Sequence, residues 1–116
     1  MIVSRLQSVL DAAPDMPWAK TIRWWNGKTK APAAAASIAS AEGVLVKRGC
    51  GVGSPALTLN AGNGMLVVNG NITGIQIPVV DGMQTLTPDT YDLTLTVTFT
   101  DGTAKRLIIG LRVANA

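Results

Sequence analysis

The chain has 116 residues, of which 47% are hydrophobic and 15% are charged, and its formal net charge is +3. This length suits one domain with a single hydrophobic core, and the composition excludes intrinsic disorder, which requires low hydrophobicity and high charge. A charged share below the roughly 25% of average domains is typical of a surface partly covered by partner subunits. It is also typical of Thr- and Gly-rich β proteins.

The residue types that are missing exclude several kinds of chemistry. The chain has no histidine and one cysteine, Cys50, which rules out a Ser-His-Asp or Cys-His nucleophile as usually built, the common zinc sites and an intrachain disulfide. Cys50 is either a reactive thiol near Lys47 and Arg48 or a buried residue of a Gly-rich turn. We therefore expect no enzymatic activity, no catalytic residue, no metal and no cofactor.

The N-terminal segment has apolar residues at spacings of three and four, which predicts an amphipathic helix. Pro14 should end this helix, and residues 15–17 then link it to the rest of the chain. A helix this short must dock, either on the domain itself or on a partner. Its apolar face gives four candidate residues for protein contact, namely Ile2, Leu6, Val9 and Leu10.

Residues 18–116 contain short β segments separated by turns, and we expect them to form one domain after the helix and linker of residues 1–17. In residues 19–25, Ile22 and Trp24 share one face, so Trp25 on the opposite face is a further candidate for protein contact. Further strands are expected at residues 44–47, 56–60, 65–68 and 72–77, with 65–68 either buried on both faces or in a crowded sheet centre, and with a bulge at Gly74. Residues 33–41 could form either a helix or a strand.

The last quarter of the chain has the clearest pattern. Residues 91–99 alternate between apolar and polar types, Asp101-Gly102 predicts a type I′ turn, and Leu107, Ile109, Leu111 and Val113 share one face of a return strand, with Ile108 the exception on the other face. Leu86-Thr-Pro-Asp-Thr-Tyr91 has the spacing of a tyrosine corner, in which the Tyr hydroxyl bonds to upstream backbone. The predicted fold is all-β, an antiparallel immunoglobulin-like β-sandwich with a short N-terminal amphipathic helix.

Three other patterns favour structure over chemistry. Gly49-Cys-Gly-Val-Gly53 lacks the helix that a phosphate loop requires. The acids Asp81, Asp89, Asp92 and Asp101 do not have the spacing of a calcium loop, and two of them stand at turns. An alternative function, a small basic OB-like nucleic-acid-binding module, rests on Trp24, Trp25 and on scattered cations. These cations are Lys20, Arg23, Lys28, Lys30, Lys47, Arg48, Lys105, Arg106 and Arg112.

Taken in order, the motifs resemble those of a known group of proteins. They are Ile-Arg-Trp-Trp-Asn-Gly at 22–27, Leu-Thr-Leu at 57–59, the 65–77 stretch, Pro-Asp-Thr-Tyr-Asp-Leu at 88–93, Thr-Asp-Gly-Thr at 100–103 and Arg-Leu-Ile-Ile-Gly-Leu-Arg-Val at 106–113. This order resembles small tail- or baseplate-associated structural proteins of bacteriophages and prophages, over about residues 20–115.

The resemblance implies a non-enzymatic virion assembly protein that forms a homo-oligomer and contacts other phage structural proteins. Nucleic acid, membrane and small-molecule partners are not expected. Because the N-terminal region lacks the apolar core of a secretion signal and no apolar run reaches about 20 residues, we expect the chain in the host cytoplasm before assembly and in the virion tail afterwards.

Overall fold

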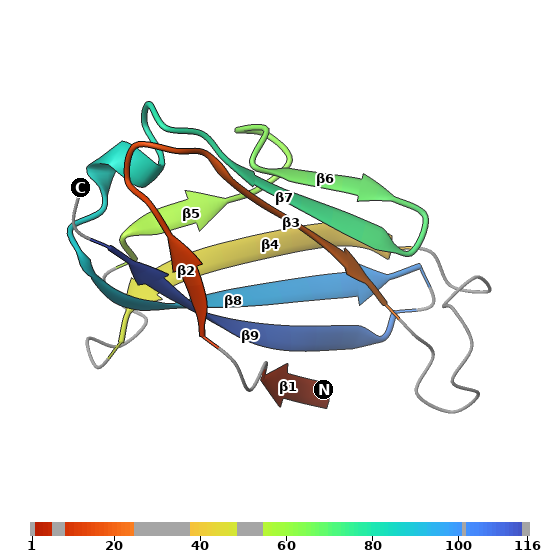
Figure 1. Cartoon of the computed structure of the whole chain (residues 1–116). Helices are drawn as coiled ribbons and strands as arrows, with labels where there is room; N and C mark the ends of the chain where they lie inside the picture. The colour runs from red at the N-terminus through yellow and green to blue at the C-terminus, as the bar shows by residue number, and fades with distance from the viewer. Residues whose placement is uncertain (1, 6–8, 25–37, 49–54, 101, 115–116) are drawn as a thin grey trace.

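The computed structural model describes residues 2–5, 9–24, 38–48, 55–100 and 102–114. These residues form two packed β-sheets, so the all-β prediction is confirmed (Figure 1). The strands in chain order are β1 Ile2–Arg5, β2 Leu10–Ala12, β3 Trp18–Arg23, β4 Ile38–Lys47, β5 Leu57–Leu59, β6 Leu66–Asn69, β7 Ile72–Ile77, β8 Asp89–Phe99 and β9 Ala104–Val113. A short 3-10 helix, η1 Met83–Thr85, lies between β7 and β8.

The larger sheet has the strand order β1-β9-β8-β4-β5, and β2 pairs with β9 on the same edge as β1. The smaller sheet has the order β3-β7-β6. All neighbours are antiparallel except β1 and β2, which run parallel to β9. Figure 1 shows the smaller sheet lying over the larger one, with β1 and β2 beside β9.

The core lies between the two sheets and is built by the period-two alternation of the strands. On β8, Leu93, Leu95 and Val97 are fully buried, and the residues between them face away from the core. The smaller sheet adds Ile75 and Ile77 from β7. The predicted inner face of residues 91–99 is therefore confirmed.

Trp24 closes one end of the core, just after β3 ends. Its side chain is buried, and its Nε1 donates a hydrogen bond of 3.0 Å to Oγ1 of the fully buried Thr73. The backbone N–H of Trp24 donates to the carbonyl of Asn71, and Asn71 Nδ2 donates back to the carbonyl of Trp24. Both buried polar side chains are thus satisfied, which is the condition for burying them without a large loss of stability.

The predicted N-terminal helix is wrong, because Ile2–Arg5 and Leu10–Ala12 are strands. Leu10 and Ala12 pack on the core while Asp11 between them is exposed, which is a strand alternation. The same apolar spacing fits both structures over so few residues. A helix of about a dozen residues is marginal in water, whereas the open edge of β9 offers a row of backbone hydrogen-bonding partners.

Two local predictions also need correction, and one open alternative is decided in part. Gly74 pairs regularly with Thr21 and Val67, so β7 has no bulge there. Residues 65–68 are not buried on both faces, because β6 is an edge strand whose Val67 is 50% exposed. Residues 38–41, left open between helix and strand, begin β4, whose pairing with β8 shifts register between Ile38 and Ser40. Residues 33–37 lie outside the described part.

The hairpin between β8 and β9 closes differently from the predicted two-residue type I′ turn. The N–H of Phe99 donates to the carbonyl of Thr103, and the N–H of Gly102 donates to the carbonyl of Phe99. The strands therefore close at Phe99 and Thr103, one residue further apart than a two-residue turn allows, and Gly102 takes a positive φ of 88°. Asp101, the other residue of the predicted turn, lies outside the described residues.

The predicted hydrogen bond of Tyr91 to upstream backbone is confirmed. The ring is 2% exposed, and its hydroxyl donates a bond of 2.8 Å to the carbonyl of Thr87. Thr87 Oγ1 lies 3.2 Å from the same hydroxyl. The bond fixes the turn into β8 against the body of the sheet.

Tyr91→Phe should lower the free energy of unfolding by about 1–2 kcal/mol, because it leaves the Thr87 carbonyl without this donor. Urea unfolding followed by tryptophan fluorescence measures the change. Thr87→Ala is the matched control, since it keeps the backbone acceptor, and it should have the smaller effect. An unchanged unfolding midpoint in Tyr91→Phe would contradict this role of the hydroxyl.

Candidate interaction surface

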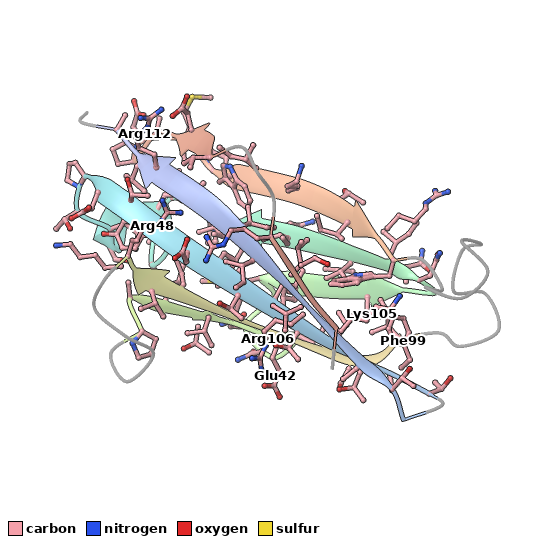
Figure 2. The ribbon with its side chains drawn as sticks, turned by 90° about the horizontal axis from the view of Figure 1, so that it is seen from below. Glu42, Arg48, Phe99, Lys105, Arg106 and Arg112 are labelled. Atoms are coloured by element: carbon pink, nitrogen blue, oxygen red, sulfur yellow. The ribbon has the colours of Figure 1, made fainter. Side chains whose placement is uncertain are left out.

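The three longest strands, β4, β8 and β9, turn one side away from the core. Pairing places outward residues in rows across these three strands, so that Val44, Thr94 and Ile108 form one row and Glu42, Thr96 and Arg106 form the next. A third row contains Ser40, Thr98 and Ala104. We call these three rows the outward face. Figure 2 looks onto it from below and labels Glu42 and Arg106.

The outward face mixes aliphatic and hydroxyl groups with two opposite charges. Its Thr94, Thr96 and Thr98 are half-buried by their neighbours, as are Val44 and Ile108. Arg106 Nε donates a bond of 3.3 Å to Thr96 Oγ1. Such a surface is suited to contact with another protein, because flat sheet faces pack on one another through short, uncharged side chains.

A charged cluster lies at one end of this face. Arg48 Nη2 is 2.8 Å from Asp92 Oδ1, and Arg5 Nη1 is 3.2 Å from the same oxygen. Arg48 Nε also donates to it at 3.3 Å. The cluster joins β1, β8 and the end of β4, so one carboxylate holds three separate parts of the larger sheet.

Gly110 makes room for this cluster. It is the cross-strand partner of Asp92, and a Cβ atom placed on it would stand 2.9 Å from Arg48 Nη2 and 3.2 Å from Val9 Cγ2. Arg48 therefore reaches Asp92 by passing over a residue that has no side chain. This is a close approach of the kind for which a strand retains glycine.

The two arginines lower the pKa of Asp92, chiefly through the hydrogen bond from Arg48 and its positive charge, against partial burial, which raises it. Lys47, at 3.0 Å, lowers the pKa of Asp89 through a hydrogen bond, with help from the backbone N–H of Thr90. A carboxylate with a lowered pKa in the folded state stabilises that state above its unfolded value of about 3.9.

Asp92→Asn should therefore lower stability at neutral pH and have less effect in acid. The difference in free energy of unfolding between wild type and variant should stay constant from pH 7 to about pH 5. It should shrink as the pH falls through about 4 towards the lowered pKa of Asp92, where the wild type loses the same charge. Urea titrations at a series of pH values measure this, and a difference that grows in acid would contradict the assignment.

The cations that favoured nucleic-acid binding are divided between the two sheets, and three of them, Arg48, Arg106 and Arg112, lie on the outward side of the larger sheet. Lys47, Arg48 and Arg112 are each paired with an aspartate, Arg112 with Asp11 at 3.0 Å. Lys20 shares the inner side of β3 with Ile22, and Arg23 is exposed on the outer side of the smaller sheet. Lys28, Lys30 and Trp25 lie outside the described residues. Nucleic-acid binding stays a prediction, and two of the three arginines on the outward side of the larger sheet are already paired with aspartates.

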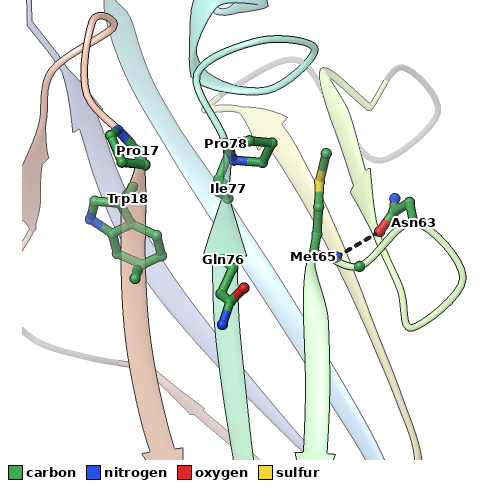
Figure 3. A pocket seen from close by; sticks show the side chains of 9 residues that line it. Pro17, Trp18, Asn63, Met65, Gln76, Ile77 and Pro78 are labelled. Atoms are coloured by element: carbon green, nitrogen blue, oxygen red, sulfur yellow. Dashed lines mark hydrogen bonds between the residues drawn. The ribbon is translucent and has the colours of Figure 1, made fainter.

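A second feature is a surface pocket of about 410 Å³ at one end of the smaller sheet. Figure 3 shows Trp18 on β3, Gln76 on the neighbouring β7 and Met65 just before β6, with Asn63 Oδ1 accepting a bond of 3.0 Å from the Met65 backbone. The lining contains no acid, base or thiol. It consists of Pro17, Trp18, Ala19, Asn63, Gly64, Met65, Gln76, Ile77 and Pro78. The pocket has apolar walls and two side-chain amides, of which that of Asn63 is held by hydrogen bonds to Asn60, Met65 and Thr58.

The five residues predicted for protein contact do not form one surface among the described residues. Val9 is 38% exposed beside Gly110, whereas Leu10 is partly buried against the core. Ile2 lies in β1, and Leu6 and Trp25 fall outside the described residues, as does Cys50. The sequence interpretation did not include the outward face among the contact candidates. Ile108, an apolar residue on the polar side of its strand, could have indicated it.

Within the described ranges, no three acidic or cysteine side chains come together as ligands for a metal ion. No helix among these same residues is long and apolar enough to cross a membrane. The fold and surface define a two-sheet all-β domain. Comparison with protein-family models, with curated proteins and with solved structures found no match.

Proposed function

We propose that this chain is a non-enzymatic structural protein of a bacteriophage or prophage, a tail or baseplate component that acts through contacts with itself and with other structural proteins. We also propose that its fold is immunoglobulin-like. The finer fold proposal is supported by the strand order. One sheet has β3, β7 and β6, the other has β4, β8 and β9, and the hydroxyl of Tyr91 bonds to backbone at the entry of β8.

One observation carries the functional proposal: the two motifs that most resemble the phage proteins form a single unit. Asp92 of Tyr-Asp-Leu and Gly110 of Arg-Leu-Ile-Ile-Gly are cross-strand partners, and Arg48 lies over the glycine to reach the aspartate. The resemblance thus rests on residues that depend on one another in space as well as in order.

The surface supports the same proposal. Within the three rows of the outward face only Glu42 and Arg106 are charged, and the other side chains are short or aliphatic. Covering short side chains loses little side-chain entropy, which favours assembly. The next outward positions along the same strands carry Arg48, Asp92 and Arg112.

Purified particles test the proposal directly. Phage or prophage particles from the source of the chain should be isolated on a density gradient, washed at high salt and analysed by mass spectrometry. We expect peptides of this chain in the particle band at a fixed ratio to the known tail proteins. Peptides found only in the soluble fraction, or a gene without tail genes beside it, would overturn the proposal.

A further inference from the structure

We propose that Asn69, at the turn between β6 and β7, is a site of spontaneous deamidation, and that this modification loosens the end of the core that Trp24 closes. The inference does not depend on the proposed function, because it concerns the reaction of one side chain with its own backbone. It is carried by the difference in hydrogen bonding between Asn69-Gly70 and a second asparagine–glycine pair, Asn63-Gly64.

An asparagine followed by a glycine reacts when two groups are free to meet. The backbone nitrogen of the glycine gives up its proton to hydroxide and attacks the side-chain amide carbon of the asparagine. A new C–N bond closes a five-membered succinimide, and ammonia leaves. Water then opens the ring at either carbonyl, which gives aspartate or isoaspartate. Glycine is the most permissive follower, because it has no Cβ atom to obstruct the attack.

At Asn69-Gly70 neither reacting group forms a hydrogen bond with another described residue. Asn69 ends β6 as the register partner of Ile72, so Gly70 and Asn71 form a two-residue turn in which Gly70 has a positive φ of 63°. Asn69 and Gly70 are exposed, and a Cβ atom placed on Gly70 would meet nothing within 4 Å. The pairing with Ile72 restrains the Asn69 backbone, which slows ring closure, but it engages neither the amide nor the Gly70 N–H.

The pair Asn63-Gly64 is held at both reacting groups. The Asn63 side chain is also exposed, but its Oδ1 accepts a bond of 3.0 Å from the Met65 N–H and its Nδ2 donates one of 2.8 Å to the carbonyl of Thr58. The attacking group, the N–H of Gly64, donates a bond of 3.2 Å to the carbonyl of Ala61. Exposure therefore does not distinguish the two asparagines, whereas their hydrogen bonds do.

Deamidation at Asn69 changes the turn that holds Trp24. The carbonyl of Asn71 accepts a bond of 2.9 Å from the Trp24 N–H, and Asn71 Nδ2 donates one of 3.2 Å to the Trp24 carbonyl. Isoaspartate routes the main chain through its side-chain carbon and so lengthens the chain directly before this turn. A two-residue connection then no longer closes in register. We expect the modified chain to lose the bonds between Asn71 and Trp24.

Ageing of the folded and the unfolded chain tests the site. The full chain is kept at mildly alkaline pH with and without urea, then cleaved by cyanogen bromide, which separates Asn63 from Asn69 at Met65. Mass spectrometry with fragmentation assigns each product, including that of Asn26-Gly27, which lies outside the described residues. In urea, Asn63 and Asn69 should react at similar rates. In the folded chain, Asn69 should react about tenfold faster or more, because several hydrogen bonds must break before Asn63 can react.

The control variant is Asn69→Gln, whose longer side chain cannot close a five-membered ring. Asn69→Ser, which has no amide, replaces it if circular dichroism shows that the first variant is unfolded. Aged wild type should show faster hydrogen exchange at the Trp24 N–H and a lower thermal midpoint than fresh protein, whereas the aged control should show neither change.

Each other outcome overturns a stated part of the inference. Equal rates at Asn69 and Asn63 in the folded chain would mean that hydrogen bonds do not select the site. A folded chain that stays intact at Asn69, while the chain in urea reacts there, would exclude the site itself. Complete modification of Asn69 with unchanged exchange at Trp24 and an unchanged midpoint would exclude the loosening of the core.

Discussion

Leu95→Ala should lower the free energy of unfolding by about 2–5 kcal/mol. Leu95 is fully buried at the middle of β8, which is the central strand of the larger sheet. Its cross-strand partners are Gly43 on β4 and Leu107 on β9. Gly43 has no side chain to fill the space that the variant opens, so the cavity should collapse little and the loss should fall in the upper half of this range.

Val67→Ala is the matched control for Leu95→Ala. Val67 is an aliphatic strand residue that is 50% exposed, so its truncation opens no cavity and should cost less than about 1 kcal/mol. Chemical unfolding of both variants measures the difference. Equal losses in the two variants would mean that the inner and outer faces of the larger sheet have been assigned incorrectly.

Gly82→Ala should destabilise the protein by about 3 kcal/mol, the upper part of the range for overpacking. Gly82 is buried just before η1, and a Cβ atom there would overlap the carbonyl oxygen of Pro78 and stand 2.9 Å from Ile77 Cγ2. Backbone cannot yield as a flexible side chain can. The Gly82 carbonyl also accepts bonds from the N–H and the hydroxyl of Thr85. A shift of Gly82 would therefore displace the fully buried Met83 beside it.

Gly74→Ala separates this effect from the general cost of replacing a glycine. A Cβ atom on Gly74 would meet only ordinary contacts of 3.8 and 4.0 Å with Val67, and an alanine within a strand loses less backbone entropy on folding. This control should be neutral or stabilising by up to about 1 kcal/mol. Thermal unfolding compares the two variants, and a Gly82→Ala protein as stable as the wild type would contradict the close packing of this turn.

The sequence predicted the parts of the fold that depend on local pattern. Residues 91–99 alternate over a long run, which only a half-buried strand satisfies, and Tyr91 has the spacing that brings its hydroxyl to Thr87. The helix predicted for the N-terminal segment was wrong because the apolar spacing of this segment fits a helix and two short strands equally well. The strand structure of this segment depends on pairing with the open edge of β9. That edge is about a hundred residues away, so a short stretch of sequence does not reveal it.

The candidate surface was predictable only in part. The outward side of β8 was evident from its threonines, and Ile108 indicated that the polar side of β9 has an apolar position. The rows, however, depend on register between β4, β8 and β9, and register places Glu42 and Arg106 on either side of Thr96. The contact of Arg48 with Asp92 likewise joins residues 44 apart. Such contacts between distant residues cannot be inferred from spacing along the chain.

The parallel pairing of β1 and β2 with β9 has a consequence for biosynthesis. Ile2 is the register partner of Lys105, and Ala12 is that of Val113. During translation the first strands leave the ribosome long before β9, the strand they pair with. Their backbone groups therefore lack their partners in the sheet while nearly the whole domain is made. Contacts between such distant positions slow folding, so this edge of the sheet can be completed only after β9 itself has left the ribosome.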